Sequence, residues 1–351
     1  MVFAQIITTY FCGIDLHARS MFVTVMNKAG EVLFRRDMPN DFNVFLKFME
    51  PYLSSLAVGV ESTYNWYWLA DACRPAKIPF YLGHALYMKA ITGGKKKNDR
   101  IDSKTIADLM RSNMFPLAYA YPKEMRATRD LLRRRHRMVS LRAEAYTHIQ
   151  LIFTQQGILN IDGAAVKSKK TRHTLVENFS QPDLKMTIES DLNVIEAFDP
   201  IVAKLERQII AQAKYHDRQA YELLQTVPGI GEMLALTILY EMHSAARFES
   251  PQQFSSYCRV VKCERTSCGK STGGGNQKIG NPYLKWALGQ IIIHAQAFSP
   301  RIKRYYEQLL AKFGKGRAKS IIAHQFAVAI YYMLKNGKVF DEVRFVQSRM
   351  K

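Results

Sequence analysis

Four carboxylates have the types and spacing that metal-dependent chemistry requires: Asp15, Glu61, Asp99 and Asp102. The first two close apolar stretches, and the other two open a predicted helix. A carboxylate beside a buried strand is costly unless something neutralises it. Hard cations such as Mg²⁺ take oxygen ligands, and two of them about 4 Å apart can hold the attacking and leaving oxygens of a phosphodiester. The acids therefore predict a site for Mg²⁺ or Mn²⁺.

The segments that position these acids alternate between strand and helix patterns. Strands are expected where Val, Ile and Phe gather, and helices where apolar residues recur every three or four positions. The expected order is strands at 11–17, 21–27 and 31–38, a helix from 42 to 49 capped by Asp41, a strand at 56–61, a helix at 64–73, a strand at 79–83 and a helix at 102–110. This is the order of the RNase H-like α/β fold.

A second region follows the prolines at 116 and 122, which mark a boundary. Its first stretch is predicted to be helical and is rich in arginine. A solvated helix face is one explanation, but arginine at this density favours contact with phosphates. The arginines expected to bind nucleic acid are Arg126, Arg129, Arg133, Arg134 and Arg137.

Further along, apolar residues recur every seven positions, which indicates paired helices. They are Ile188, Ile195, Val202 and Ile209. Pro200 interrupts the run, so it either kinks one helix or starts a second one. The period alone does not separate an intramolecular hairpin from a coiled-coil contact between two chains.

The segment from Val227 to Gly231 has the sequence Val-Pro-Gly-Ile-Gly and resembles a helix-hairpin-helix turn. Glycines let backbone N–H groups approach a phosphate, and the helix that follows offers its positive end. Gly229 and Gly231 are therefore candidate nucleic-acid contacts. The alternative is a plain tight turn between two packed helices.

Residues 262–280 are the most distinctive part of the C-terminal third. Four basic residues, Lys262, Arg265, Lys270 and Lys278, accompany the hydroxyls of Thr266, Ser267, Ser271 and Thr272. From the residues alone this is a basic loop that could wrap a phosphate backbone. A serine needs activation to attack phosphorus, and the loop offers positive charge but no evident base.

The cysteines and histidines predict little metal chemistry. Cys258, Cys263 and Cys268 are evenly spaced, but a paired Cys-x-x-Cys and a fourth zinc ligand are missing. Five cysteines do not form a complete disulfide framework, so reduced thiols are expected. Among the histidines only His17, next to Asp15, is expected near the acids.

Composition limits the class of protein. The chain has 351 residues, 50 Lys and Arg against 30 Asp and Glu, and a formal charge of +20, which predicts a polyanionic partner. No stretch approaches the roughly 20 apolar residues of a membrane span, and no leader pattern is seen, so a cytoplasmic, nucleoid-associated location is expected. We expect domains at 1–118 (catalytic), 119–218 (helical, oligomerisation) and 219–351 (C-terminal, mainly helical).

Six segments together resemble one family. They are Gly13-Ile14-Asp15, Val60-Glu61-Ser62-Thr63, the run from Asn98 to Ser103, the run from Val227 to Gly231, the run from Thr266 to Lys270 and the run from Lys278 to Leu284. They look like the motifs of insertion-sequence transposases that have a RuvC-like DEDD domain and a serine-containing C-terminal domain, the bridge-RNA-guided DNA recombinases. Their order and spacing are more specific than any single motif.

The resemblance implies a mechanism and partners. Ser267 matches the family's nucleophilic serine, although Cys268 stands where glycine is more usual and Ser271 and Thr266 remain alternatives. The implied reaction cuts and rejoins DNA through a covalent phosphoserine. The implied partners are the DNA of the element ends and target, a guide RNA, and further copies of the chain, as a dimer and as a tetramer in the synapse. Family resemblance thus favours a coiled-coil dimer.

Two other functions fit the same residues. A structure-specific nuclease would use the four acids and water, and Ser267→Ala would still cut DNA. A binding protein without catalysis would keep the basic surface, and Asp15→Ala would change only binding. The complete set of acids argues against the second alternative.

Overall fold

The computed structural model describes residues 2–92, 98–158, 163–261, 264–267, 270–274 and 278–347; for 264–267 and 270–274 it describes the backbone. The described chain forms two compact units, Met1–Glu124 and Met125–Lys351. The helical middle and the C-terminal third therefore belong to one unit. The finer division expected at 218–219 stays a prediction.

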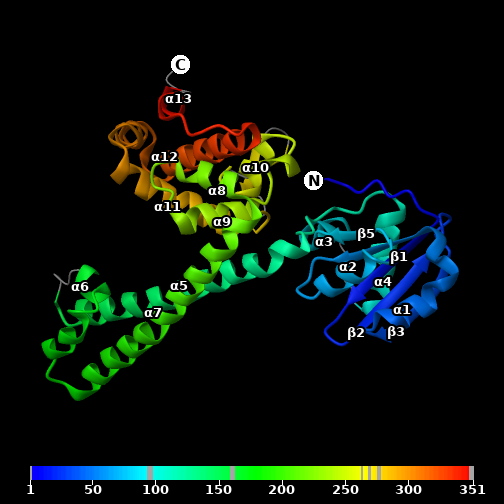
Figure 1. Ribbon diagram of the computed structural model, residues 1–351, viewed down its shortest axis with the longest axis horizontal. Helices are drawn as coiled ribbons and strands as arrows, with labels where there is room; N and C mark the ends of the chain where they lie inside the picture. The colour runs from blue at the N-terminus through cyan, green and yellow to red at the C-terminus, as the bar shows by residue number, and fades with distance from the viewer. Residues whose placement is uncertain are drawn as a thin grey trace. The chain divides into compact units, whose positions relative to one another are not determined.

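The first unit is built on a five-stranded sheet (Figure 1). Its elements are β1 Tyr10–Leu16, β2 Ser20–Met26, β3 Val32–Pro39, α1 Phe42–Met49, the 3₁₀ helix Glu50–Ser55, β4 Leu56–Glu61, α2 Tyr67–Cys73, β5 Phe80–Gly83, α3 Ala85–Thr92 and α4 Asp99–Arg111. The strand order is β3-β2-β1-β4-β5, with β1, β2 and β3 antiparallel and β4 and β5 parallel to β1. The predicted fold class is confirmed, and α3 is an element that the sequence patterns did not predict.

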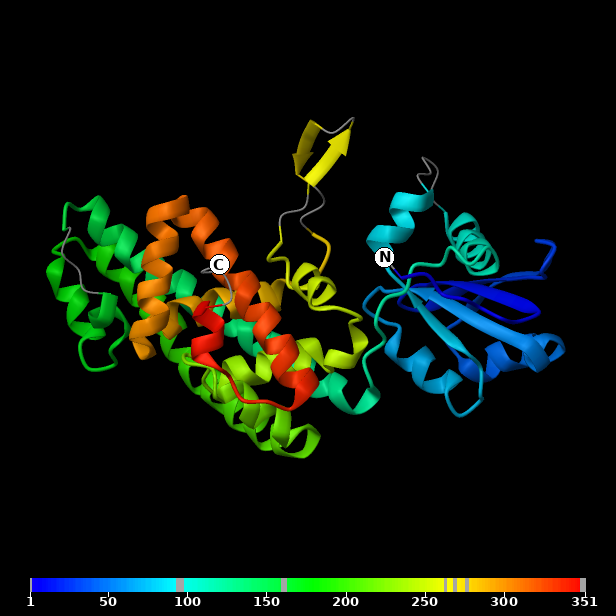
Figure 2. The same cartoon turned by 90° about the horizontal axis from the view of Figure 1, so that it is seen from above.

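Alternate residues of β1 face two different apolar cores, because side chains on a strand point to opposite faces in turn. Cys12 and Ile14 pack in one core with Phe45 of α1 and Leu69 of α2. Phe11 packs on the other face, in a core that contains Met88 of α3 together with Ile106 and Met110 of α4. Figure 2 shows helices on both faces of the sheet. Asp15 shares the face of Phe11 and therefore lies on the side of α4.

In its described residues the second unit is helical apart from the short hairpin of β6 and β7. It contains α5 Lys123–Gln155, α6 Gly163–Lys167, the 3₁₀ helix Arg172–Asn178, α7 Pro182–His216, α8 Arg218–Gln225, α9 Glu232–Met242, the 3₁₀ helix Ala245–Arg247, α10 Pro251–Tyr257, β6 Glu264–Ser267, β7 Lys270–Gly274, α11 Pro282–Phe298, α12 Pro300–Asn336 and α13 Glu342–Gln347. Its main core joins α9, α11 and α12, with Tyr240, Ile291 and Phe326 fully or almost fully buried. Within the described residues, no helix is long and apolar enough to cross a membrane.

Helices α5 and α7 form an antiparallel hairpin (Figure 1). Their ion pairs are Arg135 with Glu206 at 2.5 Å, Arg142 with Asp199 at 2.8 Å and His148 with Asp191 at 2.6 Å. As the residue number rises along α5, the number of its partner falls along α7, in steps of about one heptad. The two helices therefore run in opposite directions.

The heptad residues of α7 are buried inside this single chain. Ile188 and Ile195 pack against Ile149 and Phe153 of α5. The intramolecular hairpin therefore accounts for the period, without requiring a second chain. Pro200 lies inside a continuous α7 rather than at the start of a new helix.

Candidate active site and serine hairpin

Two of the four acids lie near each other because two parallel strands end at the same edge of the sheet. Gly13 of β1 pairs with Gly59 of β4, and Asp15 and Glu61 each follow two residues later on the same face. Helix α4 begins at Asp99, where Asn98 caps it by accepting a hydrogen bond from the N–H of Ile101 at 2.9 Å. Asp99 and Asp102 therefore stand in the first turn of α4, where the positive end of the helix favours carboxylates.

Two glycines allow α4 to lie against the sheet. A Cβ added to Gly13 would lie 2.1 Å from the carbonyl oxygen of Ser103 and 2.5 Å from the N–H nitrogen of Ala107. Both atoms belong to the backbone of α4 and cannot move aside singly. A Cβ on Gly59 would instead meet the sulfur of Met110 at 2.3 Å, at the end of a flexible side chain. In the Gly-x-Asp sequence of β1, the glycine thus lets α4 pack closely against the strand, and the aspartate lies next to the first turn of α4.

The pKa of Asp15 depends on its burial and on the charged groups around it. Burial raises the pKa of Asp15 to about 6; His17 opposes this rise, while the charges of Asp102, Asp99 and Glu61 add to it. All three other acids therefore lie near enough to repel the Asp15 carboxylate. Repulsion of this kind favours a bound cation, because the cation makes the charged form of every acid favourable.

His17 links two of the acids. Its Nε2 atom lies 3.5 Å from Asp15 Oδ2 and 3.2 Å from Asp99 Oδ2. Potential ligand atoms of Asp15, His17 and Asp99 all lie within 4.8 Å of one another, and this is the group found among the described residues that could hold a metal ion. Carboxylate oxygens with one imidazole suit Mg²⁺, Mn²⁺ and related divalent ions. Two of the four predicted ligands, Asp15 and Asp99, thus join His17 in a group that fits a divalent cation, whereas Glu61 and Asp102 are not members of this group.

The predicted nucleophile lies at the end of a short β-hairpin in the second unit. Ser267 is the last residue of β6 and pairs with Lys270, the first residue of β7. Thr266 pairs with Ser271. The side chains of all these residues, and of Arg265, lie outside the described atoms, and Lys262, Cys263 and Cys268 lie outside the described residues.

The two ends of this loop are held together by Arg259. Its Nε donates to the carbonyl of Ile279 at 3.1 Å, and its Nη2 donates to the carbonyls of Gly280 at 2.9 Å and of Lys278. The N–H of Asn281 bonds the carbonyl of Tyr257 at 2.6 Å. Gly280 has a φ of +97°, and a Cβ there would lie 2.6 Å from the same carbonyl. These contacts close the stem below the β6–β7 hairpin.

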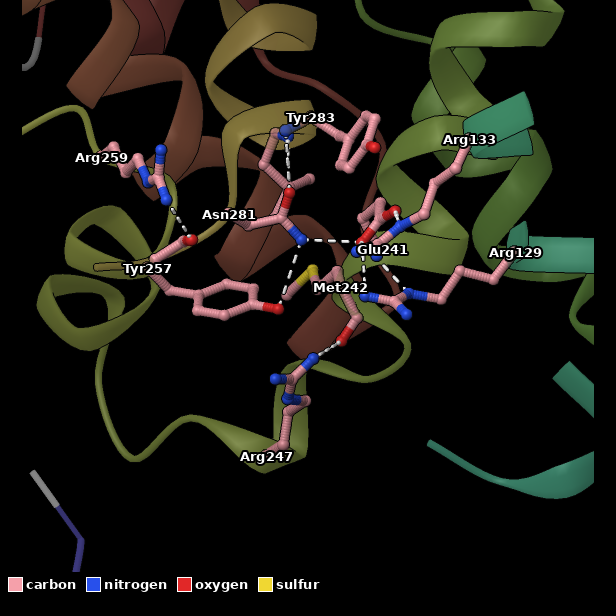
Figure 3. Close-up of polar contacts among 11 residues, drawn as sticks. Arg129, Arg133, Glu241, Met242, Arg247, Tyr257, Arg259, Asn281 and Tyr283 are labelled. Carbon is pink, nitrogen blue, oxygen red and sulfur yellow. Dashed lines mark hydrogen bonds and ion pairs between the residues drawn. The ribbon is translucent and has the colours of Figure 1, made fainter. Parts of the chain in front are cut away.

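Glu241 anchors this stem to α5 (Figure 3). The Nδ2 of Asn281 donates to Glu241 at 2.7 Å, and the Oδ1 of Asn281 caps α11 by accepting from the N–H groups of Tyr283 and Leu284. Arg129 and Arg133 contact the same carboxylate at 2.9 and 2.6 Å. Glu241 is 1% exposed, so its charge is balanced inside the protein by these two guanidinium groups.

The arginines predicted to bind nucleic acid divide into two groups. Arg126 and Arg129 are buried, and Arg129 and Arg133 bind Glu241. Arg134 and Arg137 are exposed, and Arg137 lies 3.7 Å from Glu144, which is also exposed. The exposed pair is the part of this cluster that a phosphate backbone could reach.

The glycines of the predicted helix-hairpin-helix turn have different surroundings. Gly229 has a φ of +87°, and a Cβ there would lie 2.5 Å from the backbone nitrogen of Ala295 in α11. Packing against α11 is therefore enough to require glycine at this position. Gly231 is the N-cap residue of α9 and has open space around it. Lys278 is exposed and lies at the stem of the serine loop.

Sequence reasoning did not identify Glu241 or Arg259. Glu241 is an acid within the otherwise apolar run from Leu234 to Met242, and such an isolated charge is a usable signal of a buried ion pair. Its partners are 108 and 112 residues away, so the sequence does not identify them. Arg259 has a φ of 57°, and nothing in its sequence neighbours predicts that backbone conformation.

Two family models match the chain in the regions that carry these features. A model described as a transposase, of the DEDD type found in IS110 elements, matches residues 12–156. A model described as the transposase of the IS116/IS110/IS902 family matches residues 221–307. The first match contains all four acids, and the second contains Glu241 and the β6–β7 hairpin.

Named relatives are similar over most of their length. The transposase for insertion sequence element IS1328 of Yersinia enterocolitica is 22% identical over 337 residues, 94% of this chain and 98% of the relative. The transposase for IS1111A of Coxiella burnetii is 21% identical over 250 residues, 70% and 68% of the two chains. A probable family 20 transposase of Pseudomonas aeruginosa is 22% identical over 289 residues, 79% and 81%. The chain, with its acids at the carboxyl ends of β1 and β4, belongs to the IS116/IS110/IS902 family of insertion-sequence transposases, enzymes that act on DNA.

Proposed function

We propose that this transposase cuts and rejoins DNA strands with the four acids of the first unit and Ser267 of the second. The observation that carries the proposal is the placement of the acids: Asp15 and Glu61 end neighbouring parallel strands, and Asp99 and Asp102 stand in the first turn of α4. Burial raises the pKa of Asp15, and the charges of the other three acids raise it further. Asp15, Glu61, Asp99 and Asp102 would hold Mg²⁺ or Mn²⁺. When bound, the cation supplies positive charge to the scissile phosphate and to the oxygen that leaves it.

Ser267 then performs the exchange of bonds. Its hydroxyl oxygen loses a proton and bonds to phosphorus while the bond from phosphorus to the 3′ oxygen breaks, and that oxygen leaves as a 3′ hydroxyl. The phosphoserine conserves the energy of the phosphodiester, so a 3′ hydroxyl of another strand can reverse the reaction and rejoin DNA without ATP. The closed stem at Arg259 and Asn281 supports this role, because it fixes both ends of the loop that carries the serine.

The partners proposed are DNA, a guide RNA and further copies of the chain. The net charge of +20 supports binding of polyanions such as DNA and RNA. Val194 and Ile201 support self-association, because they lie one heptad apart on α7 and are 41% and 45% exposed. Dimers, and tetramers in the synapse, would then form through the outer face of the hairpin.

The test is a denaturing gel of the protein incubated with labelled DNA from a junction of its element, the flanking RNA and Mg²⁺. Wild type is expected to give a covalent protein–DNA adduct. Ser267→Ala and Asp102→Ala should both remove it, and Ser271→Ala should keep it. Cleaved DNA without an adduct, undiminished in Ser267→Ala, would instead establish a nuclease that uses water and overturn the serine assignment. An adduct lost only in Ser271→Ala would move the nucleophile to that residue.

A further inference from the structure

A pair of arginines, Arg35 and Arg100, lies on the same face of the sheet as the four acids, and neither forms an ion pair with any residue that the structure describes. Arg35 of β3 pairs in register with Thr24 of β2, and Thr24 pairs with Gly13 of β1. Paired residues on neighbouring strands point to the same face, so Arg35 extends toward the side that α4 covers. Thr24 bonds Ser103 of α4 at 2.8 Å, which fixes α4 above this row of residues.

Arg100 comes from the helix above the same row. It precedes Ser103 by three residues on α4, and the Ser103 hydroxyl donates to the carbonyl of Arg100 at 3.4 Å. Residues three apart lie on one face of a helix. Burial lowers the pKa of Arg35, and the nearby charge of Arg100 lowers it further, so the two guanidinium groups are close enough to repel each other.

Among the residues that the structure describes, neither guanidinium has a carboxylate partner. In the part of the chain that the structure describes, no ion pair includes Arg35 or Arg100, and the buried Nε of Arg35 has no hydrogen-bond partner. On the following turns of α4, Lys104 and Arg111 share the single carboxylate of Asp108 at 3.2 and 3.4 Å. Two guanidinium groups that repel each other, with a buried donor left over, form a site for an anion with several acceptor oxygens.

We propose that Arg35 and Arg100 bind a phosphate of the DNA strand whose neighbouring phosphate lies at the acids. Arg35 stands two strands from Asp15 and two residues back along the sheet, which is about 10 Å across and about 7 Å along. Arginine binds phosphate through a planar fork of N–H donors, and a second guanidinium can occupy the remaining oxygens. The proposal rests on the proposed function only in naming the acids as the place of cleavage.

The experiment compares Arg35→Gln and Arg100→Gln with Arg36→Gln. Arg36 is the next residue of β3, points to the opposite face and stacks over Phe48 at 4.5 Å, so its loss removes the same charge from the same strand. The probe is fluorescein-labelled DNA of an element end, titrated in EDTA at several salt concentrations. Each of the two variants is expected to weaken binding roughly tenfold and to lower the slope of log Kd against log salt by about 1. Arg36→Gln should match wild type.

Further variants keep the test decisive. Arg35→Lys retains the charge and the salt slope but should bind DNA more weakly, and it replaces Arg35→Gln if thermal unfolding shows that the latter does not fold. Equal effects of Arg35→Gln and Arg36→Gln, or unchanged slopes in both arginine variants, would overturn the proposal. The proposal would also be overturned if the salt slope of the Arg35 and Arg100 variants changed with the element's RNA but not with its DNA. Asp102→Ala separates the two ideas: if it still cuts DNA, the proposed function fails while the salt slopes of the arginine variants stand.

Discussion

Glu241 is the residue on which the second unit depends most directly. Burial alone would raise its pKa, but the hydrogen bond from Arg133, the charges of Arg129 and Arg133 and the hydrogen bond from Asn281 outweigh burial and hold the pKa below the ordinary value. A carboxyl whose pKa is lower in the folded state than in the unfolded state stabilises the fold above the unfolded pKa. That stability is lost as the pH falls through the folded pKa.

We expect Glu241→Gln to lower the free energy of unfolding at pH 7 by about 3–5 kcal/mol, because it leaves Arg129 buried without its counter-charge. The difference from wild type should begin to shrink as the pH falls below the ordinary carboxyl pKa of about 4.5, and it should vanish only below the lower folded pKa, where the wild-type carboxyl is neutral as well. Urea unfolding at several pH values measures both effects. The control is Glu222→Gln, which breaks an exposed pair with Arg218 and should change nothing measurable. A constant difference at every pH would contradict the assigned role of the charge.

A second prediction at this scale concerns Asp15. Saturating Mn²⁺ binds the folded first unit and should stabilise it, by about 2.7 kcal/mol when the ion is present at 100 times its Kd. Asp15→Asn is expected to abolish this gain, since it removes a charged ligand from the cluster. Asp37→Asn is the matched control, because Asp37 is an exposed acid in the same row of the sheet. Thermal unfolding with Mn²⁺ and with EDTA gives the comparison, and equal stabilisation of Asp15→Asn and wild type would exclude Asp15 as a ligand.

At the scale of elements, the position of α4 decides whether the acids meet. Its backbone lies so close to β1 that only glycine fits at position 13, whereas position 59 faces the flexible end of Met110. One helix therefore carries two of the acids and depends on a strand residue for its approach to the other two. The same type of substitution should have unequal effects at the two glycines.

We expect Gly13→Ala to reduce the free energy of unfolding by about 3 kcal/mol, because the added methyl group must displace α4. It should also remove the stabilisation by Mn²⁺, since α4 carries Asp99 and Asp102. Gly59→Ala should be milder, about 1 kcal/mol, because Met110 can change its rotamer. Chemical unfolding with and without Mn²⁺ tests both statements. A larger loss in Gly59→Ala would show that β4, and not β1, limits the approach of the helix.

The elements also show what the sequence could predict. Asp15 and Glu61 could be placed because each ends a run of strand-forming residues, and parallel strands bring such ends together. The sequence could not show which α5 arginines are taken up inside the protein, because Arg129 and Arg133 bind Glu241, which is more than 100 residues away. Likewise, the sequence allows Pro200 to start a new helix. The ion pairs that α5 makes with α7 on both sides of Pro200 keep α7 continuous instead.

For the whole molecule, the acids and the serine lie in different compact units of the chain. If one active site takes its acids from one subunit and its serine from another, a mixture of Ser267→Ala and Asp102→Ala proteins should form the adduct that neither forms alone. The amount is expected to be a fraction of the wild-type level, because only some mixed assemblies contain a complete site. The denaturing gel measures it, with each variant alone as the control. No adduct in the mixture, with wild type active, would mean that each subunit builds its own site.

The series of ion pairs between α5 and α7 also constrains how the length of this helical hairpin can change among members of the family. Seven residues of helix extend an arm by about 10 Å. The ion pairs recur close to that interval, after seven and then six residues on α5 and after seven and then eight on α7. An insertion in one helix alone would shift every later pair out of register, whereas matched insertions of seven in both would lengthen the arm and leave the pairs intact. Descendants of this gene should therefore gain or lose coding sequence in this arm as coupled blocks of twenty-one nucleotides, or else at its tip.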